Sequence, residues 1–365
     1  MAIIPEYRDP TLLAVDRAIE KAQDTEPRKY LGMSQIGHPC RRALWYSFRH
    51  CTPIFHKALS LKRFACGHNG EDLQSKRINM VQGVELHTHQ PNGEQFGFSD
   101  FGGHFRGHMD GAIHGLIQAP KTWHVWEHKQ TDEKKQAKLQ KLKNEKGEKN
   151  ALAEWDEIYY GQAIVYMDYS GMERHYLTCS SPGGRHTISV RTNADKMIAA
   201  NLKEKAKTII FAPEPLERLS ERPDWFQCNW CDHKSICHHK RVPQMNCRTC
   251  AHSTPCRDGG WKCEAHDIML SFDAQLAGCG DHLFIPALIP YAEMTKADSE
   301  KIPKWVEYKH ENGTVFWNIT NASSAAIHEN AYLSLELNHA DSTLIGNDLV
   351  NELRATFSGR IGETA

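Results

Sequence analysis

The chain has 365 residues, 40% of them hydrophobic, and a formal net charge of −1. This length allows two domains or one domain with a large appendage. A balanced charge gives no global attraction for nucleic acid, so any DNA contact must come from local patches. No apolar run is long enough to span a bilayer, and the first residues lack the order of a signal peptide. We therefore expect a cytoplasmic protein without a membrane partner.

Cysteine and histidine are the strongest compositional signal. The chain has 12 Cys and 22 His, and seven of the cysteines lie between Cys228 and Cys263. In a reducing compartment, such clustering indicates metal sites before disulfides.

The N-terminal part reads as helices followed by strands. Residues 1–30 predict a polar helical lead-in, and a helix is expected to begin after Pro39, at Cys40, Arg41 and Arg42. Residues 60–80 predict a second helix, which carries Glu71. Residues 81–114 alternate in polarity, which is typical of an antiparallel meander.

Residues 107–129 contain two strand-like runs joined by a turn-rich connection. The first run carries Asp110, and the second carries Glu127 and Lys129. Side chains two residues apart on a strand share a face, so Glu127 and Lys129 should project together, within reach of Asp110 on the neighbouring strand. Two carboxylates and a lysine are the groups needed to hold a divalent cation beside a phosphodiester.

The next segments complete an α/β unit. Residues 132–150 are dense in lysine, and we favour a solvated helix over an arm that contacts phosphates. Residues 155–169 predict an amphipathic helix with Gln162 and Tyr166 on one face. Two strands and a helix over 193–210 follow, and the proline-rich stretch 213–225 ends the compact part.

The cysteine region divides into two groups. Cys228, Cys231 and Cys237 form a tight loop that needs a fourth ligand from elsewhere. The second group begins with the pair Cys247 and Cys250, whose spacing is typical of a tetrahedral zinc site. Two further ligands are expected from Cys256, Cys263, His266, Cys279 and His282, and our choice is Cys263 and Cys279. Residues 283–365 show mixed strand and helix signals.

Four motifs in order resemble the PD-(D/E)xK nuclease superfamily, in particular its RecB-like branch. They are GHNGE ending at Glu71, GHMDG with Asp110, EHK with Glu127 and Lys129, and QAIVY with Gln162 and Tyr166. The resemblance implies an α/β restriction-endonuclease-like core over residues 31–240, with a central mixed sheet flanked by helices. Residues 241–365 would then form a Cys/His-rich module that binds zinc.

The cysteines extend this resemblance. Cys40 precedes the nuclease motifs, and Cys228, Cys231 and Cys237 follow them, an order similar to CRISPR-associated RecB-like nucleases and AddB-type nuclease domains. The resemblance implies a four-iron four-sulfur cluster, although spacing alone also allows zinc. The layout is similar to phage-encoded members, which would place the protein in the host cytoplasm. The region after residue 240 has no counterpart in the minimal four-cysteine nucleases, and the chain has no GxxxxGK[ST] loop of a helicase motor.

The resemblance also implies roles for these residues. Asp110, Glu127 and Glu71 would bind Mg²⁺ or Mn²⁺, and Lys129 would position or activate the attacking water. Gln162 and Tyr166 would orient the water, the lysine or the phosphate, and Arg41 and Arg42 would contact DNA phosphates. The implied function is a DNA exonuclease of recombination, repair or end processing, with a recombination or single-strand-annealing protein as a further partner. The alternatives are an inactive nuclease-fold DNA-binding protein and a zinc-containing regulatory protein that binds nucleic acid.

Overall fold

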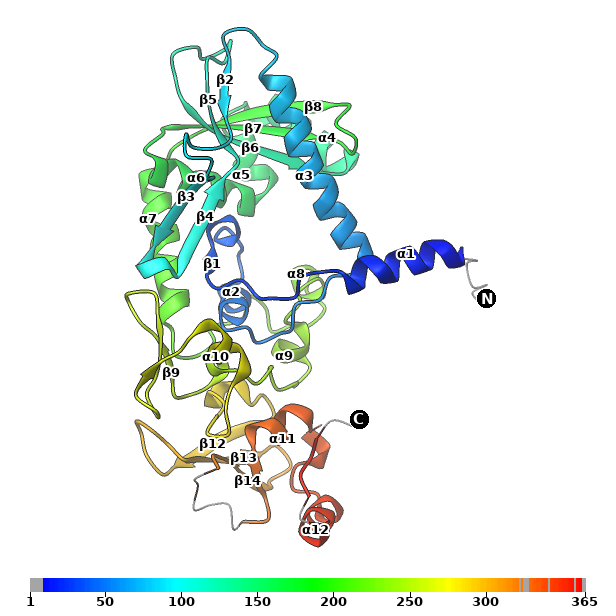
Figure 1. The fold of residues 1–365 in the computed structure, drawn as a ribbon, viewed down its shortest axis with the longest axis vertical. Coiled ribbons are helices and arrows are strands. Elements are labelled where there is room, and N and C mark those ends of the chain that lie inside the picture. Colours follow the sequence, from blue (N-terminus) through cyan, green and yellow to red (C-terminus); the bar gives the residue numbers. More distant parts are fainter. Residues whose placement is uncertain (1–8, 322, 324–327, 341, 358, 363–365) are drawn as a thin grey trace.

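A computed structural model describes residues 9–321, 323, 328–340, 342–357 and 359–362. The described part of the chain leaves out residues 1–8 of the predicted lead-in. It also leaves out residues 322, 324–327, 341, 358 and 363–365 of the predicted 241–365 module. The molecule is elongated, with an α/β unit at one end, a cysteine-rich middle and a second sheet at the other end (Figure 1). Among the described residues, no helix is both long and apolar enough to cross a membrane.

The α/β unit is built on a five-stranded mixed sheet, as predicted. The strand order is β2-β5-β6-β7-β8, in which β6 and β7 are parallel and the other neighbours are antiparallel. The strands are β2 Glu85–His87, β5 Gly111–His114, β6 His124–Gln130, β7 Arg174–Ser180 and β8 Thr187–Asn193. The first five residues of β6 are all buried, which identifies β6 as the central strand of the core.

Helices pack around this sheet. They are α3 Ala58–Ile78, α4 Glu133–Lys146, α5 Ala151–Trp155, α6 Glu157–Ser170 and α7 Lys196–Phe211. Helix α6 begins at Asp156, whose side chain accepts from the first free backbone amides, and ends at Gly171 in the left-handed conformation. Asp156 is therefore a favourable N-cap, because its carboxylate accepts hydrogen bonds from backbone amides that have no partner in the helix. Gly171 is a favourable C-cap, because glycine has no Cβ to clash in the left-handed conformation.

The predicted meander over 81–114 is wrong, because these strands divide between two sheets. Strand β4 Phe105–Met109 pairs with β3 Phe96–Asp100 and with the short β1 Leu31–Gly32, whereas β2 and β5 belong to the large sheet. The chain crosses between sheets at Asp110. Gly111 permits the crossing, since a Cβ there would lie 2.6 Å from the carbonyl oxygen of His87.

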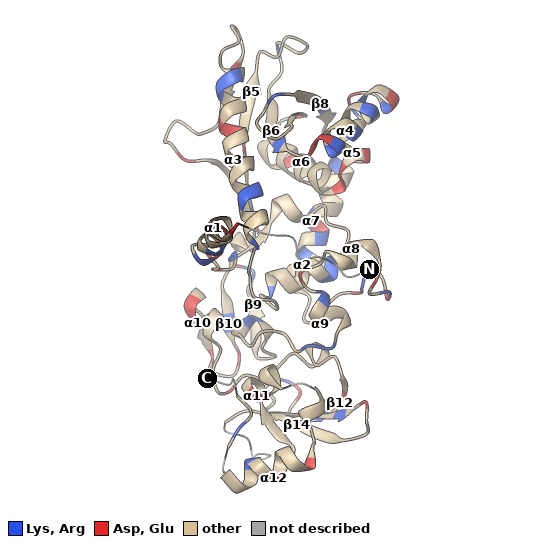
Figure 2. Cartoon of the chain, turned by 90° about the vertical axis from the view of Figure 1, so that its right-hand side faces the viewer, with Lys and Arg blue, Asp and Glu red and all other residues tan. Residues whose placement is uncertain are grey.

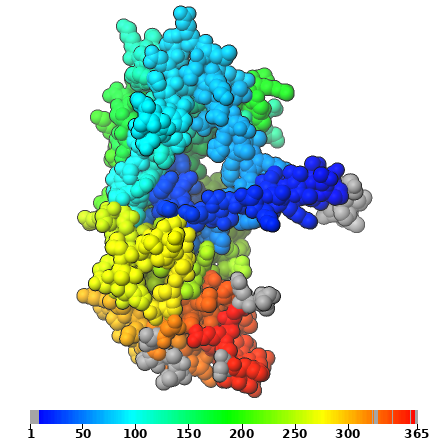
Figure 3. All heavy atoms as spheres, in the orientation of Figure 1, coloured from blue at the N-terminus to red at the C-terminus, as the bar shows by residue number. Residues whose placement is uncertain are grey.

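The N-terminal helix α1 Pro10–Lys21 projects from the body and has no buried residue (Figures 1 and 3). The chain then passes through the 3₁₀ helix η1 Met33–Gln35 to α2 Arg41–Phe48, which is mostly buried. Further 3₁₀ turns are η2 Phe101–Gly103, η3 Cys247–Thr249, η4 Pro286–Leu288 and η6 Ser342–Leu344.

The C-terminal part contains two smaller sheets. The first has β9 Ser253–Pro255, β10 Trp261–Cys263 and β11 Ile268–Met269, and the second has β12 Ala292–Ala297, β13 Trp305–His310, β14 Val315–Ile319 and β15 Ala331–Leu333. The helices of this half are α8 Phe226–Asn229, α9 Lys234–His238, α10 Phe272–Ala277, α11 Ser334–His339 and α12 Asp348–Phe357.

The packing is continuous across the predicted boundary at residue 240. Trp261 and Leu288 share one hydrophobic cluster with Trp45 of α2. Buried Arg49 donates to the carbonyl of Arg248 at 3.0 Å, and buried Arg248 donates back to the carbonyl of Phe48 at 2.8 Å. The cysteine-rich region is therefore joined to the α/β unit by core contacts and not by a linker.

Candidate active site

Asp110 and Glu127 meet where the chain crosses between the two sheets. Gly111 pairs with Trp126 in the β5–β6 ladder, which places Asp110 beside Glu127. The Asp110 amide donates to Glu127 Oε1 at 3.3 Å, and the His128 amide donates to Asp110 Oδ2 at 2.8 Å. Each carboxylate is thus fixed by the backbone of the other strand.

Lys129 joins these carboxylates from the same face of β6. Its Nζ lies 2.8 Å from Glu127 Oε2 and 4.0 Å from Asp110 Oδ2. The Lys129 side chain is 19% exposed and the Glu127 side chain 2% exposed, so the three charges lie largely out of water. The sequence prediction that these three side chains converge agrees with this geometry.

Burial and crowding shift the pKa values of this group. Burial, followed by repulsion from Asp110, raises the pKa of Glu127 to about 8, although Lys129 opposes the shift. Burial lowers the pKa of Lys129, but the charges of Glu127 and Asp110 outweigh it, and the net pKa is raised. Lys129 therefore remains a cation, and the crowded carboxyl of Glu127 keeps its proton to a higher pH than an isolated glutamate does.

Glu71 approaches from helix α3. The helix crosses β6 closely at Gly70, where a Cβ would lie 3.0 Å from Gln130 Nε2. Burial, and then the charge of Asp110, raises the pKa of Glu71 to about 7. Glu71 is thus a third carboxylate on the same cluster, whereas His68 of the same motif is exposed.

Gln162 and Tyr166 support the cluster from α6. Gln162 is buried, and its Nε2 donates to Glu127 Oε2 at 2.9 Å. Tyr166 is buried one turn further on, against Gly107, where a Cβ would lie 2.8 Å from the tyrosine hydroxyl. Burial is the main cause that raises the pKa of Tyr166, which also interacts with Gln162. Gln162 donates a hydrogen bond to the Glu127 carboxylate, and Tyr166 in turn interacts with Gln162.

The sequence analysis missed two neighbours of Lys129. Its Nζ lies 5.5 Å from the ring centroid of Tyr159, and Lys135 Nζ lies 4.8 Å from the same ring. Lys135 is held there by Asp156, with Nζ 2.7 Å from Oδ2. Tyr159 precedes Gln162 by one turn of α6, a spacing that could have identified it. The helix α4 agrees with the predicted solvated helix, but Lys135 packs against Tyr159, the ring that Lys129 also approaches.

The donor set fits a divalent cation, because Mg²⁺ and Mn²⁺ prefer hard carboxylate oxygens. Glu71, Asp110 and Glu127 supply three carboxylates whose mutual repulsion a cation would relieve. In the part of the chain that the structure describes, no three His, Cys, Asp or Glu side chains form a ready-made metal-binding group. Lys129 and Gln162 both donate to Glu127 Oε2, and these two hydrogen bonds fix the orientation of the Glu127 carboxylate.

Four thiols far apart in the sequence surround one small apolar hollow. Cys40, at the start of α2, lines it together with Cys228, Cys231 and Cys237. Burial, and then the Cys40 and Cys237 thiols among other neighbours, raises the pKa of Cys231 to about 11. Four thiols that line one hollow are the ligand type of a thiolate metal centre, although in the described part of the chain they do not form a ready-made metal-binding group.

Thiols of the second cysteine group lie near one another, although no three of them form a ready-made metal-binding group among the described residues. Burial is the main cause that raises the pKa of Cys247 to about 11 and of Cys250 to about 12, and each is raised further by neighbouring thiols. These neighbours include Cys279 and, for Cys247, Cys263. Cys256 instead faces charged side chains, and His282 Nε2 lies 3.0 Å from the Asn246 carbonyl. His266 Nε2 is 4.0 Å from Cys279 Sγ, at the edge of the group.

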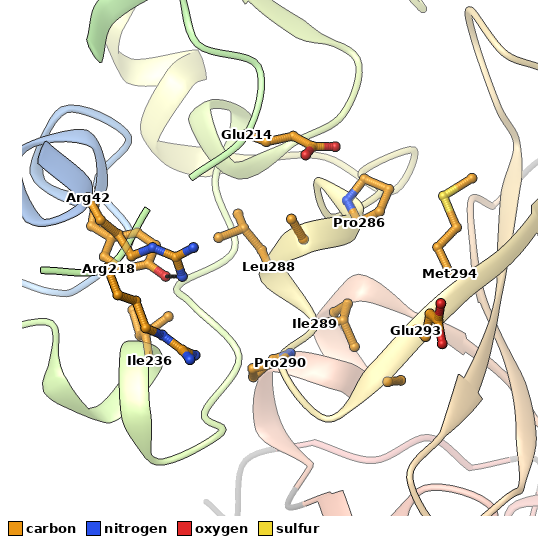
Figure 4. Close-up of a pocket in the computed structure, with 13 residues that line it drawn as sticks. Arg42, Glu214, Arg218, Ile236, Pro286, Leu288, Ile289, Pro290, Glu293 and Met294 are labelled. Carbon is orange, nitrogen blue, oxygen red and sulfur yellow. Dashed lines mark hydrogen bonds between the residues drawn. The ribbon is translucent and has the colours of Figure 1, made fainter. Parts of the chain in front are cut away.

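The two predicted DNA-binding arginines differ in their surroundings. Arg41 is exposed at the start of α2. Arg42 donates to the Leu216 carbonyl and, at 3.3 Å, to the Tyr46 hydroxyl. It lies with Arg218 on one side of a hollow of about 440 Å³, and Ile289 and Glu293 lie across from these arginines (Figure 4). Only Arg41 is therefore free of such carbonyl and hydroxyl contacts.

Comparison with known proteins gives weak likenesses. No protein-family model matches the sequence, and no curated protein matches it significantly. Among solved structures, an alkaline exonuclease (LHK-Exo) from Laribacter hongkongensis is 11% identical, with 53% of this chain and 90% of that chain covered and a TM-score of 0.33. A phage-related exonuclease from Haemophilus somnus 129PT is 12% identical, with 40% and 69% covered and a TM-score of 0.28. The structure titled SSO0001 is 13% identical, with 62% and 96% covered and a TM-score of 0.35. Likenesses of this size carry no functional conclusion, which must come from the site itself.

Proposed function

We propose that this chain is a divalent-metal-dependent DNA nuclease that acts as an exonuclease. The observation that carries the proposal is the buried cluster in which Lys129 and Gln162 both donate to Glu127 beside Asp110. Burying two adjacent carboxylates costs free energy unless a cation compensates them. An ion pair with Lys129 would need only one carboxylate. A role as metal ligands explains why Glu127, Asp110 and Glu71 are all present.

Each residue of the cluster would have a different role in catalysis. Glu71, Asp110 and Glu127 would hold Mg²⁺ or Mn²⁺, which would neutralise charge on the phosphate and lower the pKa of a bound water. Lys129 has a raised pKa and stays protonated, so it orients the phosphate or the water as a point charge. Gln162 fixes the orientation of the Glu127 carboxylate, and Tyr166 fixes Gln162.

We further propose that both cysteine groups are structural metal sites. Cys40, Cys228, Cys231 and Cys237 would hold a four-iron four-sulfur cluster, and Cys247, Cys250, Cys263 and Cys279 would hold zinc. The support for the first site is that its four thiols line one hollow. The support for the second is that neighbouring thiols help to raise the pKa values of Cys247 and Cys250. The first site would close a very long loop and so stabilise the fold.

The partners and setting follow from this activity. DNA is the proposed substrate, and a recombination or single-strand-annealing protein is the proposed partner. We also propose the RecB-like branch, a phage origin and a cytoplasmic location, all of which rest on the sequence motifs.

The test is a digestion series on end-labelled linear DNA, circular DNA and single strands with Mg²⁺ or Mn²⁺. We expect release of nucleotides from linear DNA only, and loss of release in Lys129→Ala and Asp110→Asn. Lys141→Ala is the matched control, since Lys141 lies on α4 with a side chain that is 71% exposed. DNA binding without any cleavage by the wild type would favour the inactive nuclease-fold alternative.

A further inference from the structure

Three aromatic side chains stand exposed on the loop that carries the first cysteine group. Trp230 is 88% exposed, Phe226 is 62% exposed and Trp225 is 40% exposed. The ring centroids of Trp225 and Phe226 are 5.2 Å apart. Large aromatic residues are rarely displayed together on a soluble surface unless the surface binds something. We call these three residues the aromatic platform.

The loop is held in this conformation by its own hydrogen bonds. The amide of Cys231 donates to the carbonyl of Cys228 at 3.3 Å, which closes a turn that contains Trp230. Lys234 Nζ donates to Asn229 Oδ1 at 2.7 Å, and Asn229 Nδ2 donates to the Asp224 carbonyl at 3.0 Å. These hydrogen bonds hold the turn in one conformation, and this conformation directs the Trp230 side chain into solvent.

Cations lie next to the platform. Lys205 Nζ is fixed beside Cys40 by the carbonyls of Ile36 and His38, at 2.7 and 2.6 Å, and exposed Arg41 begins α2 there. Figure 2 shows lysine and arginine positions on α2, whose N-cap, Cys40, lines the same hollow as Cys228. Two acids of this region have partners, since Asp224 pairs with Arg222 and Glu157 accepts from Gln227, whereas exposed Asp232 adds a negative charge two residues from Trp230.

The platform is connected to the active site through α6. Gln227 Nε2 donates to Glu157 Oε1 at 3.5 Å, and Glu157 is the first residue of α6. Gln162, which holds Glu127, lies five residues further, about 7.5 Å along the helix axis. A strand seated on the platform would thus need to span only a few nucleotides to reach the carboxylates.

We infer that Trp225, Phe226 and Trp230 stack against unpaired bases of a single DNA strand that leads to the active site. Exposed aromatic rings beside cations are the combination that binds single-stranded nucleic acid without sequence preference, because every base has a π-face. Exposed aromatic rings with a polar rim also occur at protein interfaces, but the lysine and arginine side chains of this region favour a phosphate backbone. This inference rests on the proposed action on DNA.

The experiment measures fluorescence anisotropy with a labelled oligothymidine of about 20 nucleotides and with an abasic strand of equal length. The parent is Lys129→Ala, which prevents cleavage. We expect Trp230→Ala and Phe226→Ala each to raise the Kd for oligothymidine about tenfold, equivalent to about 1.4 kcal/mol. The Kd for the abasic strand should not change, and Trp230→Phe should retain most of the affinity.

Control variants distinguish a loss of base stacking from a loss of bound metal or of the folded structure. Phe357→Ala removes a 74% exposed ring on α12, at the end of the molecule away from the α/β unit (Figure 1), and should leave both Kd values unchanged. Phe226 lies outside the turn between Cys228 and Cys231, so its variant decides the question if Trp230→Ala loses bound metal. Unchanged affinity in both variants, or equal weakening on the abasic strand, would overturn the platform and leave the nuclease proposal intact. Failure of the parent to bind either strand would overturn the nuclease proposal as well.

Discussion

Gln162 and Lys129 donate to the same oxygen of Glu127, from a helix and from a strand, at 2.9 and 2.8 Å. Each donor limits the rotation of a carboxylate that is almost wholly buried. Glu127 is therefore held in one orientation before any cation or DNA arrives, which is the arrangement that lowers the cost of reaching a transition state.

The first prediction concerns Gln162. Gln162→Ala removes one charged hydrogen bond worth about 1.5–3 kcal/mol, so we expect kcat to fall about ten- to a hundredfold and stability to fall modestly. Single-turnover digestion and thermal unfolding measure the two effects. Gln140→Ala on exposed α4 is the control. A variant with wild-type kcat would show that Gln162 has no positioning role.

The second prediction concerns pH in metal-free protein. The pKa values of Glu127 and Glu71 are raised to about 8 and about 7, so the folded chain holds protons that the unfolded chain releases. Stability should be highest at acidic pH and should fall between about pH 5 and about pH 8, by up to about 1.4 kcal/mol per pH unit for each group. Thermal unfolding across this window measures the slope.

Two changes should flatten that slope. Glu127→Gln removes the main titrating group, and added Mg²⁺ should stabilise the ionised carboxylates by mass action. A Tm that is independent of pH in the metal-free wild type would contradict the raised pKa values.

The clustering of the candidate site residues was predictable because their spacing is local. Glu127 and Lys129 share a face through the two-residue period of a strand, and Gln162 and Tyr166 through one helical turn. The division of residues 81–114 between two sheets was not predictable, since alternation marks a strand without naming its partner. Lys135 stands in a run of similar lysines, and it differs from them by its contacts with Trp155, Asp156 and Tyr159, which lie beyond α4.

The third prediction concerns Gly107. A Cβ there would lie 2.7 Å from Met33 Cβ and 2.8 Å from the Tyr166 ring, so Gly107→Ala should destabilise the protein by about 1–3 kcal/mol. Gly67→Ala is the matched control, because no atom lies within 4 Å of its Cβ position on α3. Alanine favours a helix over glycine, so this control should gain about 0.5–1 kcal/mol. Chemical denaturation measures both, and equal changes would refute the close packing of β4 on Tyr166.

The fourth prediction separates the two cysteine groups. We expect anaerobically purified protein to be brown and to contain both iron and zinc. Cys231→Ser should remove the colour and the iron, because it deletes one of four converging ligands, and zinc should remain. Cys250→Ser should remove zinc and leave iron. Elemental analysis and visible absorption measure the two metals.

The control for that experiment is Cys256→Ser, since Cys256 faces Asp258, Glu264 and Lys262 and not another thiol. It should change neither metal. Because the zinc group is joined to the α/β unit through buried Arg248, zinc loss should also lower the Tm of the whole chain in one transition. A colourless wild type that contains zinc alone would reject the iron–sulfur cluster, and zinc that persists in Cys250→Ser would reject the second group as its site.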